Sequence, residues 1–409
     1  PDLEAATFAG TAEVTLIVTE AVDELILHAL DLEIAEAWLE GSEGERLDAT
    51  ATFDTPSETV TLALSGTAEP GAWTLHTRFT GVLNDKLVGF YRSTFTDDDG
   101  TTRTLACTQF ESTHARRSFP CWDEPAFKAT FAIRLVVAED LFAVSNAMET
   151  AVDQLPDGRK RVHFAPTMYM SPYLVASVVG PLEATDVVDV DGTPLRVIAV
   201  PGKEALTPFA LEIGAFSLRY LSDWYGIPYP GDKLDLIAIP DFAFGAMENL
   251  GCVTFRETAL LLDANRSTQA ELQRVADVVA HEIAHMWFGD LVTMGWWNGI
   301  WLNEAFATFM EMMTTDAFRP EWHRWTDFGL ARSAAFDTDS LSTTRPIEYE
   351  VVTAADAEGM FDVLTYEKGA SVVRMLQQYL GEDRFQAGIR LYLTTHQFAN
   401  TETTDLWDA

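Results

Sequence analysis

The segment His281-Glu282-Ile283-Ala284-His285 carries two imidazoles and a carboxylate in the pattern HExxH. An α-helix turns by about 100° per residue, so His285 lies one turn beyond His281 and about 40° around the axis. Both imidazoles can therefore reach one point in space, whereas Glu282 lies on the flank of that helix face. Catalytic zinc typically takes three protein ligands, often including such histidines, and a water molecule. The segment predicts a zinc site that needs a third ligand.

That third ligand is predicted to be Glu304, which opens the next helical pattern, Trp301 to Phe306. The turn-rich connection from Gly289 to Gly299 is long enough to bring this second helix back alongside the first. Glu311 follows on the same helix, nearly in line with Glu304. We expect Glu311 to orient a histidine ligand through the ring nitrogen that does not bind the metal.

A second group of interest is Gly245-Ala246-Met247-Glu248-Asn249, which follows a predicted strand ending at Ile239-Pro240. The small residues Gly245 and Ala246 would let a peptide backbone lie against the chain, as at the edge of a sheet. Glu248 would then offer a carboxylate near the metal. Taken by itself, the segment is equally well explained as a glycine-containing loop with an exposed acid.

Together these motifs resemble the aminopeptidase N family of zinc metallopeptidases. HEIAH is followed after 18 residues by Glu304 and preceded by GAMEN, and the resemblance runs from about Gly89 to the C-terminus. The other matching segments are Thr108–Glu111, Arg116–Pro125, Pro240–Phe242, Trp287–Gly289, Trp296–Asn298 and Thr365–Ala370. The chain departs from the family pattern at Ser112, Gly299 and Ala305, none of which is a predicted ligand. The combination is specific because the motifs occur in order at the family's spacing.

The resemblance implies a zinc-dependent aminopeptidase with one Zn²⁺ per chain, acting on peptides with a free N-terminus. Glu248 would hold the α-ammonium of the substrate, and Glu111 and Gln109 would reach the site from the first domain. Glu282 would act as the general base and Tyr366 would stabilise the oxyanion. The remaining substrate contacts would come from Gly245, Ala246 and Met247, with Met247 and Gln109 bordering the pocket for the first side chain.

The residues before Gly180 predict antiparallel strands, because apolar and polar side chains alternate. Examples are Leu30–Ile34, Val60–Leu64, Trp73–Phe79, Phe131–Val137 and a last strand from Tyr173 to Val179. We therefore expect an N-terminal β-saddle or sandwich domain over residues 1–182, with a turn at Gly180-Pro181. The resemblance to the family agrees with this fold class.

The residues after Gly180 predict a mainly helical domain with a small sheet, over residues 183–409, and the resemblance implies that this is a thermolysin-like catalytic domain. Strands are expected at 195–200 and 234–239, and a helix at 208–225. The metal-binding helix should begin with a capping box, Thr268 and Glu271, and end at Gly289. The last residues predict the opening of another helix, so we expect a truncated catalytic domain without the family's C-terminal helical domains.

Composition excludes several partners. The 409 residues hold 27 Lys and Arg against 63 Asp and Glu, a formal net charge of -36. Nucleic acids and acidic membrane surfaces bind clustered cations, so neither is an expected partner. The charge fits either solubility or an acidic, salt-adapted proteome, since only six of the cations are Lys.

The sequence favours a cytoplasmic protein. It has an odd number of cysteines, three, and shows no pattern of a signal peptide or of a membrane span, although a removed leader is compatible with it.

Three other functions use the same residues. A zinc endopeptidase would share the ligands but would not need an ammonium anchor. A hydrolase of small lipid epoxides could be built on the same scaffold. A non-catalytic binding protein is the weakest alternative, because Glu282, Tyr366 and all three ligands are present.

Overall fold

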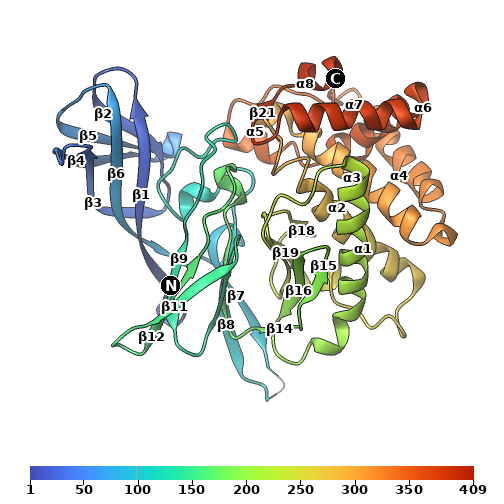
Figure 1. Ribbon diagram of the computed structural model, residues 1–409, viewed down its shortest axis with the longest axis horizontal. Helices are drawn as coiled ribbons and strands as arrows, with labels where there is room; N and C mark the ends of the chain where they lie inside the picture. Colours follow the sequence, from blue (N-terminus) through green and yellow to red (C-terminus); the bar gives the residue numbers. More distant parts are fainter. Residues whose placement is uncertain (98) are drawn as a thin grey trace.

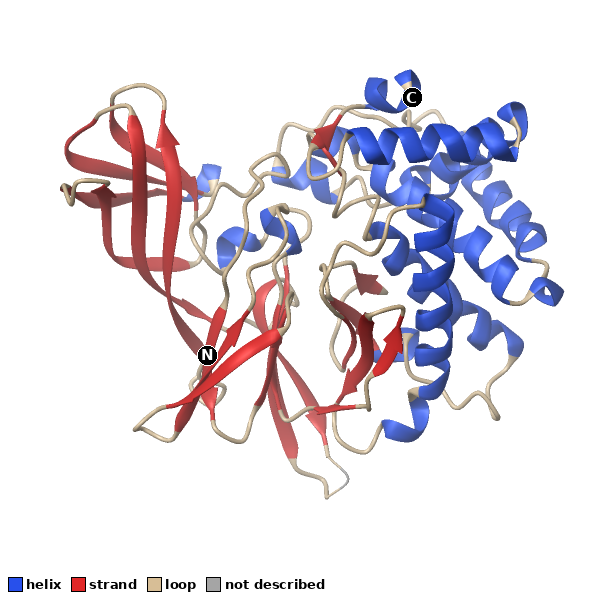
Figure 2. Ribbon diagram, viewed as in Figure 1, coloured by secondary structure: helices blue, strands red, loops and turns tan. Residues whose placement is uncertain are grey.

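The computed structural model describes residues 1–97 and 99–409. Strands dominate the N-terminal part and helices the C-terminal part, with a small sheet between them (Figures 1 and 2). This arrangement confirms the predicted fold class, a β-rich N-terminal domain followed by a mainly helical domain with a small sheet. No helix in the described part of the chain is both long and apolar enough to cross a membrane.

The first sheet has six antiparallel strands in the order β1-β6-β3-β4-β5-β2. Alternate side chains form a buried cluster that includes Leu39, Val60, Leu62 and Leu75, as the period-two pattern predicts. The strands are β1 (Thr7–Val18), β2 (Val22–His28), β3 (Leu32–Gly41), β4 (Arg46–Asp54), β5 (Thr59–Ala68) and β6 (Gly71–Val82).

Two further sheets complete the N-terminal part. The four-stranded sheet has the order β10-β13-β8-β7, and the three-stranded sheet has the order β11-β12-β9. Their strands are β7 (Gly89–Thr96), β8 (Thr102–Gln109), β9 (Arg134–Ala138), β10 (Phe142–Ser145), β11 (Glu149–Gln154), β12 (Arg159–Phe164) and β13 (Ser177–Gly180). Strand β8 is the one that matters for the site, because it ends at Gln109.

The predicted strand from Tyr173 to Val179 is wrong in its first half. Pro172–Leu174 form a 3-10 turn, and β13 begins only at Ser177. Pro172 explains the difference, because proline has a fixed φ and no N–H to donate to a neighbouring strand. The apolar side chains of Tyr173 and Leu174 are buried all the same, so they resemble strand residues in a hydrophobicity pattern.

The small sheet of the second part has the order β14-β16-β17-β19-β18, with β15 paired to β16. Strands β16, β17 and β19 are parallel, whereas β18 is an antiparallel strand at the edge. The strands are β14 (Glu183–Ala184), β15 (Val188–Val190), β16 (Thr193–Ala199), β17 (Leu234–Ile239), β18 (Ala246–Met247) and β19 (Cys252–Arg256). The described strands before residue 182 pair among themselves, as do those after it. The domain boundary there remains a prediction.

The helices cover the small sheet and form the rest of the second part (Figure 1). They are α1 (Pro208–Tyr225), α2 (Gln269–His285), α3 (Trp301–Phe318), α4 (Arg324–Asp339), α5 (Ala354–Glu358), α6 (Gly369–Leu380), α7 (Glu382–Thr395) and α8 (Thr403–Asp408). A π-helical turn, η8 (Leu364–Lys368), precedes α6, and a parallel pair, β20 (Thr293–Met294) and β21 (Asn400–Thr401), lies near the C-terminus.

Helix α2 begins with the predicted capping box, in which Thr268 and Glu271 bond each other's backbone N–H groups. It ends at His285, four residues before the predicted end at Gly289. The chain forms a wider turn there, because the N–H of Asp290 donates to the carbonyl of His285, five residues back, over 3.0 Å. Gly289 has a φ of 141° within this turn, a conformation that suits glycine.

Candidate active site

The centre of the site is a cluster formed by His281 and His285 of α2 and Glu304 of α3. The Nε2 atoms of the two histidines lie 3.0 Å apart. The Oε2 atom of Glu304 lies 3.1 Å from Nε2 of His281 and 3.3 Å from Nε2 of His285. Helices α2 and α3 pack side by side, so the structure brings all three predicted ligands together.

The outer nitrogens of the two imidazoles are fixed by acceptors. Nδ1 of His281 lies 3.0 Å from Oε2 of Glu311, as the sequence predicts for Glu311. Nδ1 of His285 lies 2.9 Å from the carbonyl oxygen of Phe288, in the turn that ends α2. Because both acceptors require an N–H at Nδ1, the Nε2 atoms carry lone pairs that point at each other and at Glu304.

This donor set fits a zinc ion. Two lone pairs and a carboxylate oxygen within about 3 Å repel one another unless a positive charge lies between them. Two histidines and a glutamate, with outer nitrogens held by a carboxylate and a carbonyl, are the ligand and support types of catalytic zinc sites. The residues present are therefore suited to hold the metal that the sequence predicts.

The electrostatics of the cluster favour a cation. Burial lowers the pKa of His285, but Glu248 and Glu304 raise it to about 9. Burial raises the pKa of Glu304, but His285 and the hydrogen bonds to both imidazoles lower it to about 2. A centre that holds a proton this strongly on a buried imidazole also stabilises a metal cation at the same point.

Glu282 and Tyr366 lie on the wall of the same cavity, which has a volume of about 300 Å³. Burial raises the pKa of Glu282 to about 8, and the two neighbouring histidines oppose this shift only in part. Tyr366 stands on the π-helical turn η8, with its ring 5.9 Å from that of His281. Burial and the nearby charge of Glu304 raise the pKa of the Tyr366 phenol, so the phenol stays protonated and can donate a hydrogen bond.

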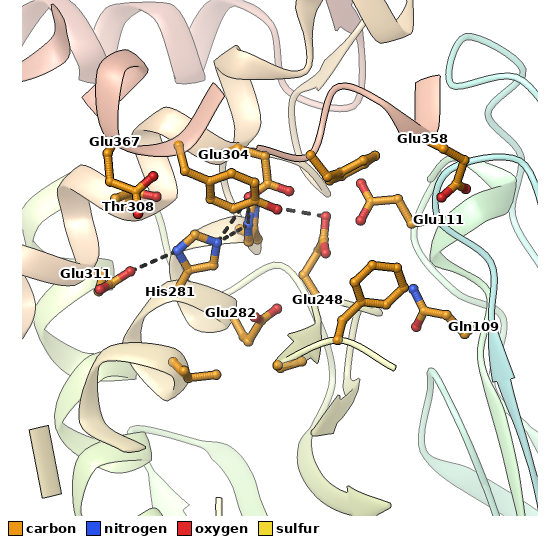
Figure 3. A pocket seen from close by; sticks show the side chains of 17 residues that line it. Gln109, Glu111, Glu248, His281, Glu282, Glu304, Thr308, Glu311, Glu358 and Glu367 are labelled. Carbon is orange, nitrogen blue, oxygen red and sulfur yellow. Dashed lines mark hydrogen bonds and ion pairs between the residues drawn. The ribbon is translucent and has the colours of Figure 1, made fainter. Parts of the chain in front are cut away.

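Two more carboxylates reach the cavity from different parts of the chain. Glu248 follows β18, and Glu111 follows β8 of the N-terminal part; Figure 3 shows both beside Glu304. Burial raises the pKa of Glu111, and the charge of Glu248 raises it further. Burial also raises the pKa of Glu248. Among the described residues, one oxygen of each carboxylate, Oε1, has no hydrogen-bond partner.

A seam of hydrogen bonds holds the four-stranded sheet that contains β8 against the second part of the chain. The hydroxyl of Tyr91, on the neighbouring strand β7, donates to the carbonyl of Asp241 over 2.9 Å. The N–H of Asp241 donates to Ser93 over 3.0 Å, and Asn146 donates to the carbonyl of Leu250 over 3.0 Å. These contacts flank the segment 245–248, so they fix Glu248 relative to Gln109 and Glu111.

The residues of the GAMEN segment differ in whether they line the cavity. Gly245 and Ala246 line the cavity, and a side chain added at Gly245 would meet open space. Ala246 and Met247 form the edge strand β18, as the comparison with a sheet edge suggested. The side chain of Met247 is buried in the core instead and is not among the described residues that line the cavity, whereas Gln109 is.

The cavity also has lining residues that the sequence did not single out. They are Phe244, Val278, Thr308, Glu358, Phe361 and Glu367. Val278 and Thr308 could have been found from helical periodicity, since they lie one turn from His281 and Glu304. Phe361 and Glu358 stand in the segment before η8, where no periodic signal indicates which side chains face the site.

Comparisons with known proteins agree with this geometry. Residues 1–174 match the peptidase M1 N-terminal domain, and residues 209–409 match the peptidase family M1 domain. Over its full length the chain is 44% identical to aminopeptidase M1-C of Oryza sativa subsp. japonica and 45% identical to aminopeptidase M1 of Arabidopsis thaliana. It is 43% identical to the puromycin-sensitive aminopeptidase of Caenorhabditis elegans, again over its full length.

The chain spans somewhat less than half the length of these curated relatives, at 46%, 47% and 44% in the same order. Both domain matches and the relatives point to the same family, and together they cover nearly all of the sequence. We conclude that the chain belongs to peptidase family M1, the aminopeptidase N family.

Proposed function

We propose that this protein is a zinc-dependent aminopeptidase, which removes the first residue from peptides with a free N-terminus. The observation that carries the proposal is the pair of buried carboxylates, Glu248 and Glu111, beside the ligand cluster. Each has an oxygen without a hydrogen-bond partner among the described residues. Buried carboxylates are costly unless a cation joins them, and a substrate α-ammonium supplies that cation when it binds.

The position of this pair relative to the cluster sets the site of cleavage. An ammonium held by Glu248 and Glu111 brings the first peptide bond of the substrate to His281, His285 and Glu304. A zinc ion held by those three residues would polarise the carbonyl group and acidify a water molecule. An anchor for the terminal amine also explains why cleavage would stop after one residue.

The proton and the developing charge are handled by two other residues. Glu282 accepts the proton of the attacking water and passes it to the leaving amine, since its carboxyl group lies on the wall of the cavity beside the cluster and burial raises its pKa toward neutrality. Tyr366 donates a hydrogen bond to the carbonyl oxygen as that oxygen becomes negative. Gly245 and Ala246 let the substrate backbone lie along the edge strand β18.

The direct test is hydrolysis of a panel of aminoacyl arylamides, with the zinc content measured on the same sample. We expect about one zinc per chain, turnover that chelation abolishes, and recovery when zinc is returned. A protein that holds zinc but hydrolyses none of the panel would contradict the proposal.

Replacing Tyr366 by phenylalanine tests the oxyanion role. We expect kcat to fall by about 10²–10³-fold, the usual loss when one oxyanion donor is removed, with a smaller change in KM. Steady-state kinetics on an alanyl arylamide measure both constants. The exposed Tyr349→Phe is the matched control and should leave them unchanged. A Tyr366→Phe enzyme with the kcat of the parent protein would rule out this role.

Glu311→Gln tests the support of the metal ligand. The amide is a weaker acceptor for the N–H of His281, so we expect zinc affinity to fall by roughly 10–100-fold. Competition with a chromogenic chelator measures the dissociation constant. The exposed Glu321→Gln removes one charge elsewhere and should bind zinc as the parent does. Equal affinities in the three proteins would show that Glu311 does not support the ligand.

A further inference from the structure

The cavity has two ends that differ in position relative to the ligand cluster. Figure 3 shows Glu311, Thr308 and Glu367 on one side of His281, and Glu111, Gln109 and Glu358 on the other. The ammonium anchor, Glu111, belongs to the second group. The side chain of the first substrate residue branches from the carbon that bears the ammonium, so with the ammonium at Glu111 it can reach the end lined by Gln109 and Glu358.

This end offers hydrogen-bond acceptors. Gln109 is 2% exposed, and its Oε1 atom has no hydrogen-bond partner among the described residues. Figure 3 shows the Gln109 side chain pointing into the cavity from β8. Glu358, at the end of α5, contributes a carboxylate at the mouth, where its side chain is 40% exposed. Glu358 is near enough for its charge to raise the pKa of Glu111.

Glu358 keeps its negative charge although it touches a histidine. Its Oε1 atom lies 3.1 Å from Nε2 of His114 and 3.2 Å from the hydroxyl of Ser112. Nδ1 of His114 accepts a hydrogen bond from Nε of Arg117 over 3.3 Å, so the proton of the ring lies on Nε2. His114 therefore donates from Nε2 to the carboxylate of Glu358. Burial raises the pKa of Glu358, but the hydrogen bonds from His114 and Ser112 lower it below its ordinary value.

The charge around the cavity is unbalanced. Seven glutamates line it, and no lysine or arginine appears among its described lining residues. A zinc dication and one substrate ammonium bring three positive charges, fewer than the seven carboxyl groups that line the cavity. The rings of Phe244 and Phe361 also line the cavity and provide apolar surface for the methylene groups of a long side chain.

We propose that this end of the cavity receives a cationic first side chain, arginine or lysine, and that Glu358 and Gln109 are the residues that select it. The inference rests on the proposed aminopeptidase function and names its preferred substrate class. Glu358 pairs with the charge of the side chain, and the Oε1 atom of Gln109 accepts one of its N–H groups. The partly exposed position of Glu358 leaves room for the length of an arginine.

Citrulline is a neutral isostere of arginine, so an arginyl and a citrullinyl arylamide isolate the effect of charge. In the parent protein we expect kcat/KM for the arginyl substrate to exceed that for the citrullinyl substrate by roughly 10–100-fold, as for a charged hydrogen-bonded pair. Glu358→Gln keeps an acceptor for His114 and Ser112, and we expect it to bring the ratio close to one. Hydrolysis of an alanyl arylamide should change by less than about twofold. The exposed Glu350→Gln is the control for the loss of one negative charge, and it should keep the arginyl-to-citrullinyl ratio of kcat/KM found in the parent protein.

Calorimetry gives a readout that does not depend on turnover. Zinc-loaded Glu282→Gln should bind argininamide at least roughly tenfold more tightly than citrullinamide, and the added Glu358→Gln change should remove the difference. Equal affinities for argininamide and citrullinamide would overturn the inference. If the parent protein also hydrolyses the alanyl substrate, the proposed function stays intact. Absence of all hydrolysis would contradict the proposed function instead, and the calorimetry would still decide whether the pocket selects a cation.

Discussion

A peptide with an acetylated N-terminus is expected to be hydrolysed roughly 10⁴-fold more slowly than the same peptide with a free amine. Acetylation removes the positive charge and leaves an amide where Glu248 and Glu111 need a cation. A binding site built to hydrogen-bond a polar group of its substrate discriminates by about 10⁴-fold against an analogue that lacks the group. The reason is that the buried polar groups of the site then have no partner. Both carboxylates are at least nine-tenths buried, so water cannot replace the ammonium at little cost.

The comparison is made with one peptide sequence in the two forms, by measuring kcat/KM from the release of the first residue or of any internal fragment. Glu248→Gln should lower kcat/KM strongly for the free peptide and hardly at all for the acetylated peptide, so the difference in kcat/KM between the two peptides should become smaller. Glu350→Gln should keep the full difference in kcat/KM between the free and the acetylated peptide. Equal rates for the two peptides in the parent protein would favour the zinc endopeptidase, which has no use for an anchor at the amine.

The part of the site that the sequence predicts best is the part formed by local geometry. The spacing of His281 and His285 places both on one helix face whatever the rest of the chain does. The spacing of Glu304 and Glu311 likewise places one beside Nε2 and the other beside Nδ1 of His281. The capping box at Thr268 is equally local, and it is present as predicted.

The approach of the N-terminal part to the site could not be predicted in this way. Gln109 and Glu111 lie far from α2 in the sequence, and they entered the site only through resemblance to a family. Their placement depends on long-range contacts such as that between Tyr91 and Asp241. Glu358 is more difficult still to predict, because it stands at the end of a short helix and its carboxylate contacts His114, which is far from it in the sequence. No periodic pattern indicates such contacts.

The errors in the fold have local causes as well. Hydrophobicity alone placed residue 173 in a strand, although Pro172 prevents regular pairing there. Gly289 predicts the end of α2 because glycine often follows a helix. The helix instead ends at His285, and the turn that follows places the carbonyl of Phe288 against the outer nitrogen of His285. The early end of the helix is therefore what orients the second histidine.

Glu282→Gln is expected to lower kcat by about 10²–10⁴-fold, the contribution typical of a positioned general base, while zinc stays bound. Glutamine has nearly the same shape as glutamate but cannot accept the proton of the attacking water. Glu282 is not one of the three residues of the cluster, so its loss should leave the metal affinity nearly unchanged. Kinetics on an alanyl arylamide and metal analysis of the same sample measure the two quantities together.

Glu304→Gln is the contrasting variant, because it removes the negative charge that faces Nε2 of both histidines. We expect it to lose zinc and activity together, whereas Glu282→Gln should lose activity alone. This separation distinguishes a base from a ligand, which a loss of rate by itself does not. A Glu282→Gln protein that binds zinc and turns over at the parent rate would require another group to take the proton. The described lining of the cavity holds other glutamates, of which Glu248 and Glu111 are already committed to the substrate amine in the mechanism proposed above.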